Sequence, residues 1–297
     1  MSYAIQTRNL SFAYGRQKVL NGINLDVASG HFYALLGRNG VGKTTFLKIL
    51  TGLLEPHAGT ASVLGRDTRH IRADDWMSIG YMSESQKIYD WLTGDELIAF
   101  TRNLYPNWDQ SFCDHLKRQM QLPLKQKVRS FSKGERMKLI LLLAMAFHPK
   151  LLLLDEPFSG LDVLAKEQLI SCLLDTTQQE QWAVLFTSHD LAEVERLSDD
   201  IGLIEAGHLR INESLESLQN RFRRVQVYGL DEPPEIVTSI WQLQRKEGGF
   251  SFIETAFSEA RDGELRQRLG EQLEIEPMAL REIVLAFLTE TSVTPAP

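Results

Sequence analysis

Cysteine is scarce in this chain, which has only Cys113 and Cys172 among its 297 residues. The two lie far apart in the sequence, and neither belongs to a CxxC motif or to a paired cysteine–histidine motif. A disulfide framework is therefore excluded, and both cysteines are expected to be reduced thiols of a cytosolic protein.

Long hydrophobic runs are also missing. The densest apolar segments, Leu139–Phe147 and Leu151–Leu154, are separated by Pro149 and Lys150, and both fall short of the ~20 residues that span a bilayer. The first ten residues, MSYAIQTRNL, lack a basic segment followed by an apolar one, so no signal peptide is expected. Any membrane role is therefore expected to come through a partner.

The third absence is an excess of positive charge. Lys and Arg number 32 against 39 Asp and Glu, which gives a net charge of −7. Because phosphate backbones attract clustered cations, no nucleic acid is expected as a partner. The small basic group Arg221, Arg223 and Arg224 is better explained as a solvated helix end than as a binding patch.

What the chain does have is the length and composition of a soluble globular protein. Its 297 residues suffice for one α/β core and a smaller appendage, and 43% hydrophobic with 24% charged residues is ordinary for such a fold. Residues 3–33 alternate in the manner of strands, with a turn expected at Asn21-Gly22. The short apolar strand His31–Leu36 then runs into a glycine-rich loop, and Lys43–Leu53 has the spacing of a helix.

Strand and helix patterns alternate through the rest of the first 220 residues. A helical subdomain is expected over about residues 88–147, with Pro106 and Pro123 separating its helices. This order predicts an α/β fold with a mainly parallel, helix-covered sheet. The later strands, helices and one hairpin are expected at Leu151–Asp155, Val163–Thr177, Ala183–Thr187, Leu191–Leu197 and Ile201–Ile211.

The pattern changes near Arg221. Short strands are expected at Val225–Tyr228 and Gly249–Ile253, and an amphipathic helix at Met278–Thr289. The final residues, TSVTPAP, are expected to be disordered. The sequence therefore predicts two domains, residues 1–220 and a small α+β accessory domain at residues 221–297.

A complete P-loop pattern follows the strand at His31–Leu36. The motif Gly37-x-x-x-x-Gly42-Lys43-Thr44 lies between a strand and a helix, which is the context it requires. The loop N–H groups and the positive end of the helix are suited to bind phosphate. Lys43 is placed to contact the β- and γ-phosphates, and the Thr44 hydroxyl is placed to ligate Mg²⁺. The predicted ATP-binding residues are Gly37, Arg38, Asn39, Gly40, Val41, Gly42, Lys43, Thr44 and Thr45.

An acidic pair ends the apolar strand Leu151–Asp155. At the carboxyl end of such a strand Asp155 is placed to hold Mg²⁺. Glu156 is placed to polarise the attacking water, because phosphoryl transfer needs a positioned nucleophile more than covalent help. Taken alone, the pair fits ordinary surface carboxylates equally well; downstream of a P-loop the catalytic interpretation is favoured.

With these motifs in place, the chain resembles the nucleotide-binding domain of ABC transporters over roughly residues 3–220. The segment FSKGE at residues 131–135 stands where that family has its LSGGQ signature, and Lys133 and Glu135 depart from the usual Gly and Gln. The resemblance implies that Ser132, Lys133, Gly134 and Glu135 meet the γ-phosphate of ATP bound by the other subunit.

Three further positions match the family. Tyr14 stands where an aromatic ring stacks on adenine, although a core strand aromatic remains the alternative. Ser159–Asp162 resembles the loop that passes between subunits, and His189 resembles the switch histidine that contacts the γ-phosphate. Glu156, His189 and Lys43 are therefore the expected catalytic residues.

The segment that follows Gly80-Tyr81 departs from the family. Glu84 stands where glutamine is usual and is a further candidate metal ligand, although it adds charge to an already acidic site. Tyr89, Trp91 and Leu92 come next. These side chains suit either a groove that grips a permease helix or packing beneath the helical subdomain.

The resemblance implies a P-loop NTPase fold of the ABC type, with a parallel core sheet, N-terminal antiparallel strands and a helical subdomain. The C-terminal extension and the variant signature are similar to those of ABC-2-type exporter ATPases of the YtrB-like and EcsA-like group. Membership of this group implies an ATPase that uses ATP and Mg²⁺ and closes as a homodimer. It also implies a separate membrane permease, with the ATPase bound at the inner face of the cell membrane.

Two other classes of protein stay open. A soluble ABC ATPase acting on nucleic acid or the ribosome usually carries two nucleotide domains in one chain, or a long coiled coil between its nucleotide motifs, and this acidic chain has neither. A nucleotide-binding regulator without turnover would lack the catalytic carboxylate or histidine, whereas Glu156 and His189 are both present.

Overall fold

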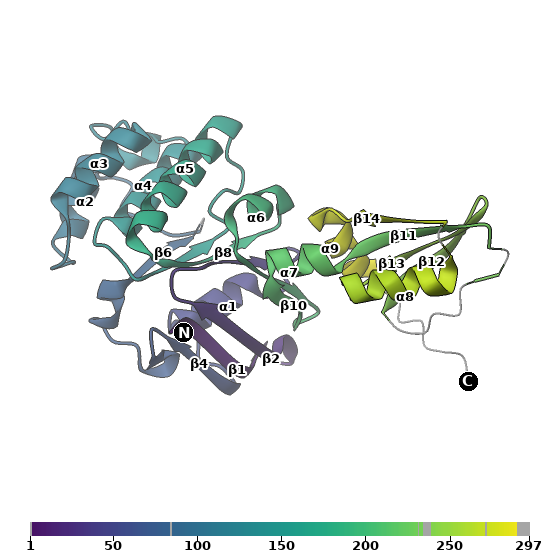
Figure 1. Cartoon of the computed structure of the whole chain (residues 1–297). Helices are drawn as coiled ribbons and strands as arrows, with labels where there is room; N and C mark the ends of the chain where they lie inside the picture. Colours follow the sequence, from purple (N-terminus) through teal and green to yellow (C-terminus); the bar gives the residue numbers. More distant parts are fainter. Residues whose placement is uncertain (1, 84, 231, 234–238, 271, 290–297) are drawn as a thin grey trace. The chain divides into compact units, whose positions relative to one another are not determined.

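The computed structural model describes residues 2–83, 85–230, 232–233, 239–270 and 272–289, apart from the side chains of residues 178 and 179. The chain divides into two compact units, residues 1–212 and 213–297 (Figure 1). The domain boundary expected at residue 220 falls at the end of helix α7 (Leu215–Arg221), the first helix of the second unit.

A six-stranded sheet forms the centre of the first unit. Its strands lie in the order β10-β9-β3-β8-β7-β6, and neighbours from β9 to β6 pair in parallel. The apolar strands β3 and β7 are buried along their whole length, as parallel strands covered on both faces must be. The predicted parallel sheet is therefore confirmed, with β3 (Phe32–Leu36), β6 (Ile79–Ser83), β7 (Leu151–Asp155), β8 (Ala183–Ser188), β9 (Asp200–Glu205) and β10 (His208–Ser214).

An antiparallel sheet is formed by the N-terminal strands in the order β2-β1-β4-β5. The turn expected at Asn21-Gly22 is wrong, because the chain reverses at Gly15-Arg16 and β2 continues through Gly22. Gly22 has a φ of 67°, and its N–H donates to the Ser11 hydroxyl at 2.9 Å, so it makes an irregularity inside the strand instead of a turn. The strands are β1 (Tyr3–Tyr14), β2 (Gln17–Ala28), β4 (Ala58–Val63) and β5 (Arg66–Asp67).

Helix α1 (Lys43–Leu50) packs against both sheets through its apolar face. Phe46, Leu47 and Ile49 are fully buried in the cluster that joins β1, β2 and β4 to β3, β7 and β8. Burying a Leu, Ile or Phe side chain stabilises the fold by about 1.5–3 kcal/mol, so the helix that follows the glycine loop is firmly anchored. It ends at Leu50, before the expected Leu53, because Gly52 takes a φ of 70° just after the last turn.

The five later helices of the first unit each begin at a side chain that accepts a hydrogen bond from the first turn. Such a cap contributes about 1 kcal/mol. The capping residues are Thr93, Asp109, Ser132, Asp162 and Asp190. Figure 1 shows α2, α3 and α4 grouped together as the helical subdomain. The helices are α2 (Gly94–Arg102), α3 (Gln110–Met120), α4 (Lys133–Met145), α5 (Val163–Glu180) and α6 (Leu191–Leu197), with short 3₁₀ turns η1 (Thr68–His70), η2 (Asp75–Ser78) and η3 (Val128–Ser130).

The second unit is a four-stranded antiparallel sheet with helices, which confirms the α+β appendage. Its strands lie in the order β12-β13-β11-β14. Helix α8 carries one buried side chain, Leu265, and this explains why no helical periodicity is apparent in its sequence. The elements after α7 are β11 (Arg223–Tyr228), β12 (Ile240–Lys246), β13 (Gly249–Glu254), α8 (Glu259–Leu269), β14 (Leu273–Pro277) and α9 (Leu280–Thr289).

Two expectations concern the membrane and the tail. Within the described residues, no helix has both the length and the apolar character needed to cross a bilayer. The tail TSVTPAP, expected to be disordered, lies outside the described residues.

Candidate active site

Three neighbouring strands of the central sheet end at the same edge. β3, β8 and β7 are adjacent and finish at Leu36, Ser188 and Asp155. The glycine loop, His189 and Glu156 follow these ends directly. The topology therefore brings together motifs that are far apart in the sequence, at the edge where open parallel sheets bind ligands.

Lys43 reaches back across the glycine loop. Its Nζ donates to the carbonyl oxygens of Gly37 at 2.7 Å and Arg38 at 3.4 Å, and it lies 3.1 Å from Oε1 of Glu156. The Lys43 side chain is only 6% exposed, so its ammonium group is fixed. A fixed cation at the positive end of a helix makes this loop a site for anions.

Gly42 allows the loop to pass close to β2. It caps α1 with a φ of 118°, and a Cβ at this position would lie 2.9 Å from Cγ1 of Val19. Any side chain here would be strained by the backbone conformation and would also collide with its neighbour. The P-loop glycine is therefore required by the packing of this chain.

Hydrogen bonds join the start of α1 to the ends of β7 and β8. The Thr44 hydroxyl donates to Oδ2 of Asp155 at 2.8 Å, and the Thr187 hydroxyl donates to Oδ1 of the same carboxylate at 2.9 Å. Thr187 also accepts the backbone N–H of Glu156 at 2.9 Å. The Asp155 carboxylate is therefore fixed in orientation, with the Thr44 hydroxyl beside it.

Glu156 links the cation of the loop to the histidine. Its Oε1 faces Lys43, and its Oε2 lies 2.8 Å from Nδ1 of His189. Glu156 has a φ of 50°, a conformation that few residues other than glycine adopt. Such strain is concentrated at functional sites, where the surrounding structure holds a side chain in one required position.

These residues surround a cleft of about 330 Å³. The cleft is lined by Asn39, Gly40, Gly42, Lys43, Thr44, Thr45, Glu156, Ser159 and His189. Of the other predicted loop residues, Gly37 and Arg38 supply carbonyl oxygens to Lys43, and Val41 packs against the apolar core. Most of the predicted phosphate-binding loop thus lies on one cleft together with the predicted catalytic residues.

The segment Ser132–Glu135 lies elsewhere. None of its residues is among the described residues that line the cleft. Ser132 and Glu135 form a reciprocal cap on α4: the Ser132 hydroxyl accepts the Glu135 N–H at 3.2 Å, and the Glu135 carboxylate accepts the Ser132 N–H at 2.7 Å. Glu at position 135 therefore has a local structural role, and Ser-x-x-Glu is its sequence signal.

Lys133 packs against the loop Ser159–Asp162 of the same chain. A Cβ on Gly160 would lie 2.6 Å from the Lys133 ammonium nitrogen, so glycine leaves the space that the lysine fills. Gly160 also has a φ of 65°, which favours glycine. Lysine at position 133 thus joins two loops that are both predicted from the sequence to lie at the subunit interface.

Tyr14 and Glu84 are the two remaining predicted site residues. Tyr14 ends β1 with 50% of its surface exposed and contacts Phe12 edge-on, so it is not a core aromatic. It does not line the cleft, and its stacking on adenine stays a prediction. Glu84, the predicted additional metal ligand, lies outside the described residues.

Thr187, which bridges the two acidic residues, is not apparent as a site residue from the sequence. Thr187 is completely buried at the end of β8, directly opposite Asp155 in the sheet register. A polar residue that closes an otherwise apolar strand is the available signal. Its partner, however, depends on which strands are neighbours, and the sequence pattern alone does not give that order.

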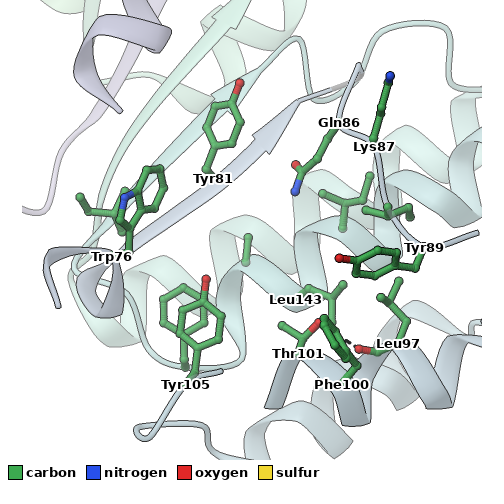
Figure 2. A pocket seen from close by; sticks show the side chains of 15 residues that line it. Trp76, Tyr81, Gln86, Lys87, Tyr89, Leu97, Phe100, Thr101, Tyr105 and Leu143 are labelled. Carbon is green, nitrogen blue, oxygen red and sulfur yellow. Dashed lines mark hydrogen bonds between the residues drawn. The ribbon is translucent and has the colours of Figure 1, made fainter. Parts of the chain in front are cut away.

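A second hollow, of about 250 Å³, lies beside the helical subdomain. Figure 2 shows Trp76 and Tyr105 on one side of it and Tyr89, Leu97 and Phe100 on the other. Tyr89 and Trp91 are 45% and 60% exposed and contact each other edge-on, so they do not pack beneath the subdomain. We call this hollow the aromatic groove; its lining includes Trp76, Tyr81, Tyr89, Leu97, Phe100, Tyr105, Leu143 and Phe147.

The sequence matches a family described as ABC transporter over residues 20–159. Among similar proteins, the ABC transporter ATP-binding protein YtrB of Bacillus subtilis is 31% identical, over 75% of this chain and 76% of the relative. The bacitracin transport ATP-binding protein BcrA of Enterococcus faecalis is 32% identical, over 78% and 76%. The lantibiotic transport ATP-binding protein SrtF of Streptococcus pyogenes is 30% identical, over 73% and 93%.

Solved structures show the same fold. An ATP-binding subunit of an ABC transporter superposes with a TM-score of 0.66 at 28% identity, over 73% of this chain and 92% of the other. A dimeric ATP-binding cassette bound to ADP and Pi, in a post-hydrolysis state, superposes with a TM-score of 0.63 at 20% identity, over 71% and 98%.

Proposed function

The chain belongs to the ABC transporter ATP-binding proteins and is an ATPase of that family, and on this premise we propose that it is the ATP-hydrolysing subunit of an exporter with a separate membrane permease. The observation that carries the proposal is the meeting of Lys43, Glu156 and His189 on one cleft, while Ser132–Glu135 lies off it. Asp155 is joined to this cleft by its hydrogen bond from Thr44. The first group supplies half of a catalytic site, and the second is available to complete a site on another copy.

ATP is held through its phosphates by residues 37–45. Lys43 is the point charge for the β- and γ-phosphates, and Thr45 lines the same cleft for the α-phosphate. The N–H groups at the start of α1 add the positive end of the helix. Tyr14 stacks on the adenine ring.

The Thr44 hydroxyl and the Asp155 carboxylate fit a magnesium ion. They are oxygen ligands 2.8 Å apart at the edge of the phosphate cleft, and Mg²⁺ prefers one or two such protein ligands together with substrate phosphates. When bound, the ion neutralises charge on the phosphate oxygens. Glu84, the residue that follows β6 in the sequence, is proposed as a further ligand of the ion.

Glu156 is the residue that orients the attacking water. Its carboxylate is held between Lys43 and His189, beside the loop that receives the phosphates. His189 contacts the γ-phosphate and holds Glu156 through Nδ1. Because phosphoryl transfer depends on positioning and charge, these three side chains supply most of what the chain itself needs to contribute.

The second half of each site comes from another copy of the chain. In a head-to-tail homodimer, residues 132–135 of one chain meet the γ-phosphate held by residues 37–45 of the other. ATP contacts both chains only when they are closed, so it shifts the population toward the closed dimer. Loss of the γ-phosphate removes that preference and lets the chains part.

The aromatic groove is proposed as the docking site for a short amphipathic helix of the permease. Exposed Tyr89, Trp91 and Phe100 offer an apolar surface beside the helical subdomain, and an amphipathic helix binds by laying its apolar face into such a groove. We therefore propose that the chain is held on the cytoplasmic side of the cell membrane by this partner.

Export is proposed from the relatives, since two of them are named as bacitracin transport and lantibiotic transport proteins. The alternative, a soluble ATPase acting on nucleic acid, has no comparable support, and the net charge of −7 is unfavourable for it.

We call the contact of residues 132–135 with ATP bound by another copy the trans-site. It is tested by adding a second substitution to a variant that binds ATP without turning it over. Glu156→Gln with Mg-ATP is expected to elute as a dimer in size-exclusion chromatography, because the nucleotide persists. Adding Ser132→Arg is expected to return the chain to a monomer with ATP affinity unchanged within about two-fold, whereas adding Ser111→Arg, an exposed serine on α3, leaves the dimer intact. A dimer that persists in the Ser132→Arg double variant contradicts the trans-site.

The partner is tested through the aromatic groove. Affinity purification of the tagged chain from detergent-solubilised membranes is expected to recover an integral membrane protein that lacks its own ATPase motifs. The double variant Tyr89→Ser/Phe100→Ser is expected to recover no membrane protein, while ATP hydrolysis by the isolated chain is preserved. Leu285 is an exposed apolar residue of the second unit, and the control variant Leu285→Ser is expected to recover the membrane protein as the natural chain does. Full recovery with the groove variant contradicts the docking site.

A further inference from the structure

Lys166, one turn into α5, reaches the segment that carries His189. Its Nζ lies 3.0 Å from Oδ2 of Asp190 and 2.6 Å from Oε1 of Glu193. The other oxygen of Glu193 accepts the Ser188 hydroxyl at 2.6 Å. Lys166 therefore contacts Asp190 directly and is linked to Ser188 through the Glu193 carboxylate. These are the two residues on either side of His189.

Local hydrogen bonds also hold the segment 188–190 in place. The Ser188 hydroxyl accepts the Asp190 N–H at 2.9 Å, and Oδ1 of Asp190 accepts the Ala192 N–H at the start of α6. Ser188 is almost completely buried. The His189 ring is itself 53% exposed and touches Glu156, so its position is set mainly by its two neighbours in the chain.

The charge of Lys166 is needed because Glu193 is buried. The Glu193 side chain is only 8% exposed, and a buried carboxylate without a counter-ion is strongly destabilising. Burial lowers the Lys166 pKa, but the hydrogen bonds that the ammonium donates to Glu193 and Asp190 raise it by more, so the ammonium stays charged. Burial raises the Asp190 pKa, and the Lys166 contact together with the Ala192 N–H lowers it by more.

Lys166 also lies close to the loop expected at the subunit interface. Its backbone N–H donates to the Asp162 carbonyl at 3.0 Å, and Asp162 is both the last residue of Ser159–Asp162 and the cap of α5. Lys166 therefore stands on the helix that begins where that loop ends. A shift of the start of α5 would move the ammonium that holds residues 188–190.

The geometry points to Lys166 as a positioning residue for ATP hydrolysis: its ammonium holds Ser188 and Asp190 so that His189 faces Glu156, and it connects the loop Ser159–Asp162 to the histidine. The expected effect of Lys166 on ATP hydrolysis rests on the proposed function. The fixed position of the His189 ring can be measured without any turnover.

The same two helices offer a matched control. Arg196 on α6 pairs with Glu167 on α5 at 2.6 Å, with side chains 42% and 47% exposed. This pair also joins α5 to α6, at the position next to Lys166, but neither residue hydrogen-bonds to residues 188–190. Removing it tests for any general loosening of the two helices.

The kinetic test compares Lys166→Met with Lys166→Arg and Glu167→Gln. We expect kcat for ATP hydrolysis to fall about 10- to 100-fold in Lys166→Met, as for a misplaced catalytic group, with the KM for ATP changed less than about two-fold. Lys166→Arg should recover most of kcat because it restores the charge, and Glu167→Gln should stay within about two-fold of the natural chain. An unchanged kcat in Lys166→Met, or an equal fall in Glu167→Gln, overturns the proposal.

Lys166→Met leaves Glu193 without its counter-ion, so a second variant guards against unfolding. Lys166→Met/Glu193→Gln removes both charges and keeps an acceptor for Ser188; it is expected to fold and still to hydrolyse ATP slowly. Normal kcat in this folded double variant overturns the proposal.

The turnover-independent readout is the NMR signal of the His189 ring, assigned by its loss in His189→Gln. It is expected to shift or broaden in both Lys166→Met variants and to stay in place in Glu167→Gln. A His189 signal that does not respond contradicts the positioning role. A responding signal in a chain that never hydrolyses ATP leaves the positioning role standing and rejects the proposed function.

Discussion

The Lys43 ammonium nitrogen lies 3.1 Å from Oε1 of Glu156, which joins the cation of the phosphate loop to the carboxylate proposed to orient water. Both side chains are largely buried, at 6% and 18% exposed. A phosphate bound in the loop would compete with Glu156 for this cation. The pair therefore couples phosphate binding to the position of the catalytic carboxylate.

The first prediction concerns the energy of this pair. Lys43→Met and Glu156→Gln are each expected to lower the free energy of unfolding, and the double variant by less than the sum, with a coupling energy of about 0.5–3 kcal/mol, as for residues in contact. Urea unfolding of the natural chain, the two single variants and the double variant, in buffer without nucleotide, measures this coupling energy. Effects that add to within about 0.3 kcal/mol would show that the pair contributes nothing.

Thr187 gives a second prediction. Thr187→Val keeps the shape but removes the donor to Asp155 and the acceptor for the Glu156 N–H. We expect a loss of about 1–3 kcal/mol of unfolding free energy, because a buried N–H loses its partner, and a fall in kcat. Thr187→Ser keeps the hydroxyl and should retain most of both. Equal stability and activity of the valine and serine variants would speak against the bridge.

The third prediction follows from the reciprocal cap at the start of α4. Glu135→Ala removes the acceptor of the Ser132 N–H and is expected to lower the unfolding free energy by about 0.5–2 kcal/mol. Glu135→Gln can still accept that bond and should lose less than half as much. Urea midpoints of the two variants measure this. A glutamine variant as unstable as the alanine variant would show that the cap is not what Glu135 provides.

The cysteines give a fourth prediction. Burial raises the pKa of Cys113 to about 11 and that of Cys172 to about 12. At pH 8 the thiol form is therefore favoured, and thiolate is what reacts. Both cysteines are expected to label with a thiol reagent at least about 100-fold more slowly in the folded chain than in guanidinium chloride. Rapid labelling of the folded chain would contradict their buried state.

Local spacing allows much of the site to be predicted from the sequence. The P-loop depends on glycines, a lysine and a threonine within nine residues, and its flanking strand and helix are visible in the apolar pattern. Asp155 and Glu156 are equally recognisable, because they end a run of four leucines. The position of each relative to the sheet then follows from the fold class.

Features that depend on which strands are neighbours could not be predicted from the sequence. Thr187 and Lys166 act through partners on other elements, so their roles appear only once β7, β8, α5 and α6 are placed. The error at Asn21-Gly22 has another cause: a strong turn signal is outweighed by the pairing of β1 with β2 on both sides of it. Helix α8 gave no signal because it buries a single side chain.

The central claim is that Glu156 orients the water in a site that ATP completes. The measurement that tests it most directly is phosphate release by Glu156→Gln with Mg-ATP, beside nucleotide retained on the same chain. The account predicts that release falls at least about 100-fold, the order of loss for one key catalytic group, while ATP stays bound at the level of the natural chain. Phosphate release at the natural rate would contradict the account.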